Sequence, residues 1–275
     1  MKKKMQSGII EIIAVLLTTI FFVTPFLFMI LNSLKDRKEA NRMEFSLPSE
    51  IHLENYAEVF KNNDYQLVLA FKNSTLITVG AVVCLIALCS LAGYVIQRRK
   101  SRFTAAANIL VMIGLMLPPS VLPTIWMLKG MHIYKTMTSM ILIETALYIP
   151  FTIMLYRGFM ATIPKELEEA AYIDGCSAGQ VFRRIIFPLL KPVTSTVVIL
   201  NAVSVFNDFT NPLYFLPGYK NSTVQLTLYN YISNFHSSYN LLFANIVIII
   251  IPMFILFLIF NKQIVAGMVA GSVKG

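Results

Sequence analysis

Few side chains in this sequence have the types and spacing that chemistry requires. The three histidines, His52, His132 and His236, lie far apart in the chain, and their spacing does not fit a metal site. The phosphate-binding pattern G-x-x-x-x-G-K-[ST] does not occur, so the chain is not expected to bind and hydrolyse ATP in the usual way. Two carboxylates, Glu144 and Asp208, fall within apolar stretches. The sequence therefore predicts a protein that is not an enzyme and has no cofactor of its own.

The two carboxylates in apolar stretches leave two interpretations open. An ionisable group inside a bilayer is costly and usually faces a cavity or a partner. Glu144 and Asp208 either reach the outer lipid headgroups or act inside the protein. In the second case they are candidates for the coupling site of an ion-driven secondary transporter.

The elements that hold these residues are strongly apolar. The 275 residues are 56% hydrophobic and 13% charged, whereas soluble domains are roughly 25% charged. A bilayer requires about 20 apolar residues per crossing helix. The sequence thus predicts an all-α membrane protein with six transmembrane helices, near Ile9–Leu34, Ser74–Ile96, Ala107–Leu128, Met137–Tyr156, Val193–Leu213 and Leu241–Phe260. The first is expected to stay as an anchor, because its apolar run is longer than that of a signal peptide and no cleavage site follows.

Lysine and arginine predict the orientation. Fourteen of the 23 lie on the side that holds both termini and the loops after the second and fourth spans, and nine lie on the other side. Positive residues concentrate on the cytoplasmic side, so both termini are expected to be cytoplasmic. The net charge of +9 then reflects orientation beside membrane lipid, and no nucleic-acid partner is expected.

The polar segment Ile163–Pro192 separates the fourth and fifth spans and has the features of two short helices. Pro164 suits the first position of a helix, where a missing N–H has no consequence. Three glutamates follow, at positions 166, 168 and 169, and favour the positive end of a helix dipole. Gly175 is expected just past the helix end with a positive φ.

The second helix of this segment is predicted to begin at a capping box formed by Ser177 and Gln180. Pro188 is expected to end it. One apolar stripe of five residues has helical spacing, namely Ala178, Val181, Phe182, Ile185 and Ile186. The pattern indicates a cytoplasmic docking element, and the alternative is an amphipathic helix lying on the membrane surface.

A second polar and aromatic loop runs from about Leu213 to Asn240 on the predicted outer side. It is too long for a minimal turn, which favours contact with a partner. The alternative is a lid that only covers the outer mouth of the protein.

The docking segment also carries a family resemblance. Its fixed positions are Glu169, Ala170, Ala171, Gly175, Ile185, Phe187 and Pro188. This order over twenty residues resembles the EAA loop of permease subunits of bacterial ABC importers, which usually have Leu at the position of Phe187. The resemblance implies that these residues dock on ATPase subunits, where the family's glutamate meets a basic groove.

Further motifs are similar to the maltose-type branch of these importers, which takes up carbohydrates. They are Asn55-Tyr56, Asn73-Ser74, Leu117-Pro118-Pro119, Asn207-Asp208-Phe209, Asn211-Pro212-Leu213 and the glycine-rich end Ala266–Gly275. The resemblance implies a multi-pass subunit of the bacterial cytoplasmic membrane that imports a sugar or oligosaccharide by alternating access. Its implied partners are a second permease subunit, two ATPase subunits that hold ATP and Mg, and an extracellular substrate-binding protein.

The resemblance also implies a division of the chain into three regions. Residues 1–72 would form the first span with its outer loop, 73–262 the importer core, and 263–275 a cytoplasmic tail that approaches the ATPases. The outer loop would contact the binding protein through Tyr219, Leu228 and Tyr231.

Candidates for a substrate path rest on residue type alone, and core packing is the alternative for each. They are Trp126, Tyr148, Asn201, Asn207, Asp208 and Asn211. In the maltose system the other permease subunit carries the sugar site. Outside this class, an ion-coupled secondary transporter using Glu144 or Asp208 and a non-transporting membrane scaffold stay open.

Overall fold

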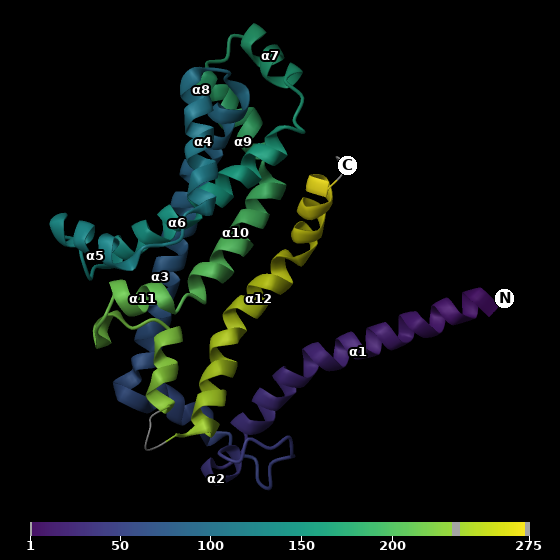
Figure 1. The fold of residues 1–275 in the computed structure, drawn as a ribbon, viewed down its shortest axis with the longest axis vertical. Helices are drawn as coiled ribbons and strands as arrows, with labels where there is room; N and C mark the ends of the chain where they lie inside the picture. Colours follow the sequence, from purple (N-terminus) through teal and green to yellow (C-terminus); the bar gives the residue numbers. More distant parts are fainter. Residues whose placement is uncertain (1, 233–236, 273–275) are drawn as a thin grey trace. The chain divides into compact units, whose positions relative to one another are not determined.

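The regular elements of the protein are helices, as the composition predicts. The computed structural model describes the backbone of residues 2–232 and 237–272, and the side chains of residues 11, 14–232 and 237–260. In chain order the elements (Figure 1) are α1 (Lys2–Ser33), α2 (Arg37–Ala40), α3 (Glu54–Arg98), α4 (Arg102–Met116), α5 (Val121–Gly130), α6 (Met137–Met160), α7 (Glu166–Ile173), α8 (Ala178–Val181), the π-helical turn η1 (Phe182–Ile186), α9 (Phe187–Leu189), α10 (Lys191–Phe206), α11 (Thr210–Phe215), the 3₁₀ turns η2 (Tyr219–Asn221) and η3 (Gln225–Tyr231), and α12 (Tyr239–Ser272). The all-α class is confirmed.

Four helices of the described residues are long and apolar enough to cross a bilayer, and they coincide with the first, second, fourth and sixth predicted spans. A fifth arises if Ala178–Leu189 and Lys191–Phe206 count as one span bent by 71°. The third predicted span is divided between α4 and α5. The break contains Pro118 and Pro119, which lack a backbone N–H and exclude helical geometry from the preceding residue. Six crossings therefore stay a prediction.

The chain separates into two compact units. Unit 1 consists of Met1–Val68 and Thr227–Ile251, and unit 2 of Leu69–Leu226 and Pro252–Gly275. The predicted regions 1–72, 73–262 and 263–275 follow chain order and stay a prediction. The side chains of the predicted tail lie outside the described residues.

In unit 1, the Asn55-Tyr56 pair fastens the end of α1. The amide of Asn55 donates to the backbone carbonyls of Ser33 and Lys35 at 2.8 and 2.9 Å, and its oxygen accepts from Asn240 at 2.8 Å. The hydroxyls of Tyr56 and Ser33 lie 2.7 Å apart. Because the last carbonyls of a helix have no partner within it, this arrangement satisfies the end of α1 with side chains.

A sharp break divides α3 between residues 62 and 65. Asn63, Asp64 and Tyr65 have φ values of 48°, 53° and 58°, in the left-handed region. The stretch that follows is continuous to Arg98 and contains the whole predicted second span, Ser74–Ile96.

Unit 2 packs α6 and α10 against the C-terminal part of α3, with α7, α8 and α9 at one end (Figure 1). The core members from these three long helices include Leu85, Tyr156 and Val197, all fully buried. Gly93 permits the close approach of α3 and α6, because a Cβ at this position would lie 3.0 Å from Cβ of Tyr156.

Large apolar side chains cover much of the exterior within each unit. They include Phe21 and Phe22 on α1, Phe103 and Met116 on α4, Leu122 and Trp126 on α5, and Phe257 and Leu258 on α12. Soluble monomers rarely expose contiguous apolar surface of this extent. These faces fit lipid or a further subunit.

The clamp at the end of α1 yields a stability prediction. Replacing Asn55 by Ala leaves two buried carbonyls unsatisfied, which we expect to lower the free energy of unfolding by about 2–4 kcal/mol. Thermal unfolding of the purified chain in detergent measures the change. Asn230→Ala removes a single bond made by an exposed side chain, the 2.9 Å bond to Gln66, and serves as the control. Equal loss in both variants would contradict the clamp.

Candidate functional site

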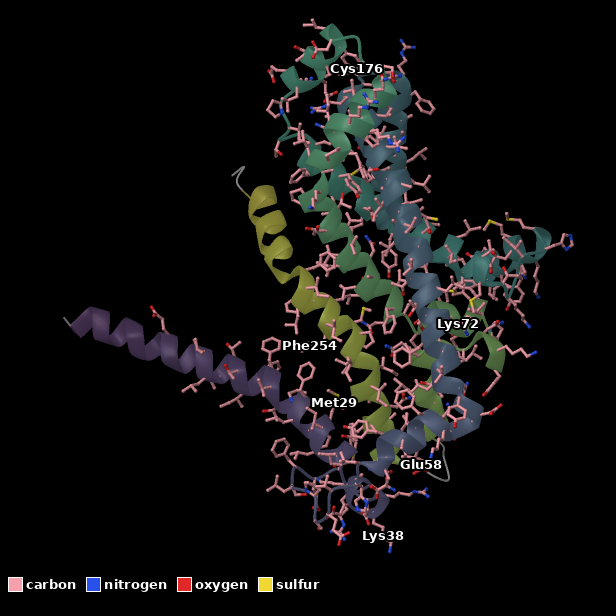
Figure 2. The ribbon with its side chains drawn as sticks, turned by 180° about the vertical axis from the view of Figure 1, so that it is seen from behind. Met29, Lys38, Glu58, Lys72, Cys176 and Phe254 are labelled. Atoms are coloured by element: carbon pink, nitrogen blue, oxygen red, sulfur yellow. The ribbon has the colours of Figure 1, made fainter. Side chains whose placement is uncertain are left out.

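The segment from Ile163 to Pro192 lies at one end of unit 2, between α6 and α10 (Figure 1). Figure 2 shows Cys176, in the connection from α7 to α8, at the end of the unit opposite Lys72. We call residues 163–192 the docking segment. Both short helices that the sequence predicts are present in it.

The start of α7 differs slightly from the prediction. Pro164 lies before the helix, which begins at Glu166, so its assignment to the first helical position is wrong. The carbonyl of Lys165 accepts from the N–H groups of Glu168 and Glu169 at 2.9 and 3.1 Å. The helix thus begins two residues later than predicted, while the three glutamates occupy the first turn as predicted.

The end of α7 agrees with the prediction in detail. Gly175 has a φ of 83°. Its N–H donates to the carbonyl of Tyr172 at 3.1 Å, and the N–H of Cys176 donates to that of Ala171 at 2.9 Å. These two bonds form a Schellman motif, which needs a left-handed residue at the position of Gly175. The glycine bend between the two helices is confirmed.

The next helix begins as predicted, since the N–H of Ser177 donates to Oε1 of Gln180 at 2.7 Å in a capping box. Its apolar stripe is also present, with one exception. Val181 and Ile186 are fully buried in the core of unit 2, and Phe182 and Ile185 are packed against that core. Ala178 is exposed, because it lies in the first turn, beyond the edge of the core.

Pro188 does not end this helix, contrary to the prediction. The chain continues through it as α9, and the 71° bend falls at Leu190. The N–H of Phe187 donates to the carbonyl of Phe182, a five-residue spacing that widens the helix just before the proline. A proline ring clashes with the carbonyl four residues earlier in a regular α-helix, and the wider turn relieves that clash.

A buried ion pair fastens the docking segment to α3. Nε of Arg98 lies 2.6 Å from Oε1 of Glu168, and the two side chains are only 10% and 9% exposed. The hydroxyl of Tyr94 donates to Oε2 of Glu168 at 2.9 Å. Nη2 of Arg98 donates to the carbonyl of Ile163 at 2.8 Å. The arginine therefore binds both the entry to the segment and its first helix.

Sequence reasoning missed this pair. It assigned Glu168 to the helix dipole and Arg98 to the positive-inside pattern. The one signal was helical spacing, because Glu168 and Ala171 are three residues apart on one face, and both are buried. A glutamate on the buried face of a helix requires a partner.

The predicted docking residues separate into an outward and an inward set. Glu169, Ala170, Gly175 and Pro188 are exposed, whereas Ala171 is buried and Ile185 is half-buried. Next to the outward set, α7 exposes three large side chains, Leu167, Tyr172 and Ile173, the last of them 87% exposed. One face of α7 thus holds the segment in place, and the other presents a glutamate among apolar groups.

The three outer-loop candidates have different environments. Tyr219 in η2 is exposed, Leu228 in η3 is half-buried, and Tyr231 is buried within unit 1. Burial also raises the pKa of the Tyr231 hydroxyl. Tyr231 is therefore inaccessible to a partner in this structure, while Tyr219 is accessible.

The loop around η2 is clamped to α3 by the Asn73-Ser74 motif. The amide of Asn73 donates to the carbonyls of Lys220 and Ser222 at 3.0 and 2.9 Å. The hydroxyl of Ser74 accepts from the N–H of Val224 at 3.0 Å. These bonds give the loop a defined backbone next to the N-terminal end of the predicted second span.

Within unit 2, four polar residues of the predicted spans come together. Asp208 accepts from the N–H groups of Thr210 and Asn211 and from the side chain of Asn211, at 2.9, 3.3 and 2.5 Å. Glu144 is fully buried, with Asp208 and Asn211 as electrostatic neighbours. Tyr148 follows one turn later on α6 and lies near both carboxylates. Glu144 thus faces protein and not the lipid headgroups.

The other substrate-path candidates lie apart from this cluster. Trp126 is 69% exposed on α5. Asn201 is buried and donates to the hydroxyl of Thr152 at 3.3 Å and to the carbonyl of Val197 at 2.8 Å. Asn207 accepts from Gln225 at 3.0 Å. The contacts of Asn201 suit core packing.

Comparison with known proteins gives concordant matches. Residues 85–269 match the family described as "Binding-protein-dependent transport system inner membrane component". The melibiose/raffinose/stachyose import permease protein MelC of Bacillus subtilis is 33% identical over 97% of this chain and 96% of its own length. The multiple sugar-binding transport system permease protein MsmG of Streptococcus mutans is 35% identical over 94% of this chain and 95% of its own.

Among solved structures, a bacterial ABC transporter involved in the import of the acidic polysaccharide alginate has a chain of the same fold. The TM-score is 0.84, with 18% identity over 95% of this chain and 98% of that chain. At this level of identity the likeness concerns the fold alone.

Two adjacent glutamates of α7 provide a matched test of the geometry. Glu168→Gln removes one partner of a buried ion pair, and we expect it to lower the free energy of unfolding by about 3–5 kcal/mol. Glu169→Gln changes an exposed side chain and should alter stability by less than about 0.5 kcal/mol. Thermal unfolding in detergent compares the two. The reverse order would show that the side chains have exchanged faces.

Proposed function

Because the chain belongs to the family of binding-protein-dependent transport system inner membrane components, we propose that it is a permease subunit of an ATP-driven importer for a sugar or oligosaccharide. Full-length similarity to permeases named for oligosaccharide and multiple-sugar transport carries the proposal. Nothing in the comparisons supports ion-coupled secondary transport. The protein is a multi-pass protein of the inner membrane, and we propose that both termini are cytoplasmic.

The docking segment is the proposed contact with an ATPase subunit. Its outward face offers Glu169 next to the exposed apolar side chains of Tyr172 and Ile173, which lie one turn further along the same helix. A carboxylate next to apolar groups loses water when a partner covers it, which strengthens its attraction to a basic groove. ATP and Mg would belong to the ATPase subunits, one of which docks here and one on a second, similar permease subunit.

Transmission from the ATPase follows from the inward face of the same helix. Glu168 binds Arg98 at the end of α3, so a displacement of α7 acts directly on that helix. The segment also continues through α9 into α10 with only the bend at Leu190 between them. Closure of the ATPases would therefore act on both α3 and α10.

The cluster of Glu144, Tyr148, Asp208 and Asn211 is the part of the proposed substrate path that the structure supports best. Sugars are bound by aromatic faces with a few convergent polar groups. Of the six candidates named from sequence, Tyr148, Asp208 and Asn211 come together, and Glu144 lies fully buried beside them. We place the path beside this cluster.

The clamped loop around η2 is the proposed contact with the extracellular binding protein. Tyr219 projects from it as an exposed aromatic group, and the backbone on either side is bonded to α3. A pre-organised loop loses little conformational entropy when a partner binds. Leu228 stays a candidate, and Tyr231 would need to leave its buried site.

Charge reversal at Glu169 tests the docking proposal. Glu169→Lys should weaken the ATPase interaction by about 2–5 kcal/mol, because an attraction becomes a repulsion at a contact closed to water. We expect membrane levels to be normal, sugar uptake to be lost and little ATPase to copurify. Glu50→Lys makes the same charge change on an exposed residue outside the docking segment and is the control, which should keep the ATPase bound. Normal uptake by Glu169→Lys with ATPase bound would refute the docking proposal.

Cysteine labelling tests the proposed topology. The three native cysteines, Cys84, Cys89 and Cys176, are first replaced by serine. Single cysteines at Lys61 and Tyr219 should react with an impermeant maleimide in intact cells, and one at Ser101 should react only after lysis. Reversed labelling would place the docking segment outside the cell and exclude an ATPase partner.

A further inference from the structure

An open cavity, lined mostly by charged and polar residues, lies in unit 2 where α3 ends, α4 begins and α6 passes beside them. Its volume is about 260 Å³. The polar part of its lining consists of Arg99, Lys100, Ser101, Thr104, Asn108 and Arg157. None of these residues belongs to the docking segment or to the polar cluster around Glu144.

The cavity has an excess of positive charge. Arg99, Lys100 and Arg157 all line it, and within the described part of the chain no carboxylate lies within 4.0 Å of any of them. By contrast, Arg98 one residue earlier is fully engaged by Glu168. Arg98 therefore has a counterion, whereas the three cations that line the cavity have none among the described residues.

Arg157 has a buried hydrogen-bond donor without an acceptor. Its Nη1 donates to Oδ1 of Asn108, but its Nε is shut off from solvent and has no hydrogen-bond partner among the described residues. Buried donors are nearly always bonded, so one left without an acceptor indicates a ligand or ordered water. Packing holds the residue here, because Gly93 of α3 lets the backbone of Arg157 approach closely.

The surroundings of the cavity favour a lipid over a free anion. Ala105 and Asn108 of α4 line the cavity, and Ile109 and Met112 continue the same helical face one turn further. Both of these apolar side chains are more than half exposed. A cavity lined mostly by charged and polar residues that opens onto an apolar face matches a phosphate headgroup with its acyl chains alongside.

We propose that this cavity binds the phosphate group of an anionic phospholipid, with the acyl chains lying along α4. Arginine suits this role because its planar group gives two parallel bonds to phosphate oxygens. Juxtamembrane cations each contribute roughly 1 kcal/mol to binding anionic lipid surfaces. A lipid held here would join α3, α4 and α6 next to the Arg98–Glu168 pair, independently of which substrate is transported.

The test uses the purified full chain in nanodiscs of phosphatidylcholine, with or without an equal part of phosphatidylglycerol. The readouts are the thermal unfolding temperature and the phosphatidylglycerol retained per chain after detergent extraction. We expect phosphatidylglycerol to stabilise the wild type. Arg99→Gln should weaken lipid retention on the order of five-fold, since about 1 kcal/mol per cation corresponds to that factor.

Arg102→Gln is the matched control. It removes the same charge three residues further along the chain, and Arg102 does not line the cavity. It should retain lipid as the wild type does. Arg157→Gln tests the second arginine of the cavity. If Arg157→Gln folds poorly, Arg99→Gln still tests the site, because Arg99 is exposed and its replacement should not affect folding. Equal losses in Arg99→Gln and Arg102→Gln would show diffuse surface attraction and overturn the site. Equal stabilisation by inorganic phosphate in phosphatidylcholine alone would assign the cavity to a free anion, and no response to phosphatidylglycerol would also refute the proposal.

Discussion

The ion pair between Arg98 and Glu168 joins two parts of the chain that lie 70 residues apart, with both side chains about nine-tenths removed from water. Charges in such a place are tolerated only when each has its partner and its hydrogen bonds. Here Tyr94 supplies a further donor to the carboxylate, and the carbonyl of Ile163 accepts from the guanidinium. Loss of either charge leaves the other buried and unpaired, so the position of α7 depends on both.

This constraint gives α3 a role at both ends of unit 2. At one end of its long straight part, Asn73 and Ser74 hold the backbone of the loop around η2, and at the other end Arg98 holds the docking segment. The 26 residues from Asn73 to Arg98 correspond to about 39 Å of helix, more than the thickness of a hydrocarbon core. One continuous helix is thus bonded to the proposed contact with the binding protein and to the proposed contact with the ATPase. Such a helix can carry displacement between them as a rigid element.

Features that depend on neighbouring residues were predictable from sequence. The bend at Gly175, the capping box at Ser177 and most of the apolar stripe follow from backbone sterics and helical spacing, which act over a few residues. The family resemblance of the docking segment rests on the same local order. The four longest helices follow from the length of their apolar runs.

Features that depend on distant contacts were not predictable. The partner of Glu168 lies in another helix, and the burial of Tyr231 depends on the packing of unit 1. Pro188 was predicted to end the helix because no local sequence pattern indicates the widened turn that lets the helix continue through it. Pro118 and Pro119 mark the place where the third span is divided. Prolines occur at kinks as well as at breaks, so the sequence alone does not distinguish a kinked helix from two helices. That Glu144 and Asp208 lie close together was likewise not predictable, because it depends on how α6 packs against the end of α10.

A double-mutant cycle on the ion pair measures directly whether the two buried charges depend on each other. Arg98→Met, Glu168→Met and the double variant are compared by the free energy of unfolding in detergent. Each single variant leaves a buried charge, whereas the double variant leaves an apolar pair, which proteins often tolerate well. If α7 is held by this pair, the double variant loses less stability than the sum of the two single losses, by at least about 2 kcal/mol. Losses that add to within about 0.5 kcal/mol would contradict it, because the two charges would then not depend on each other.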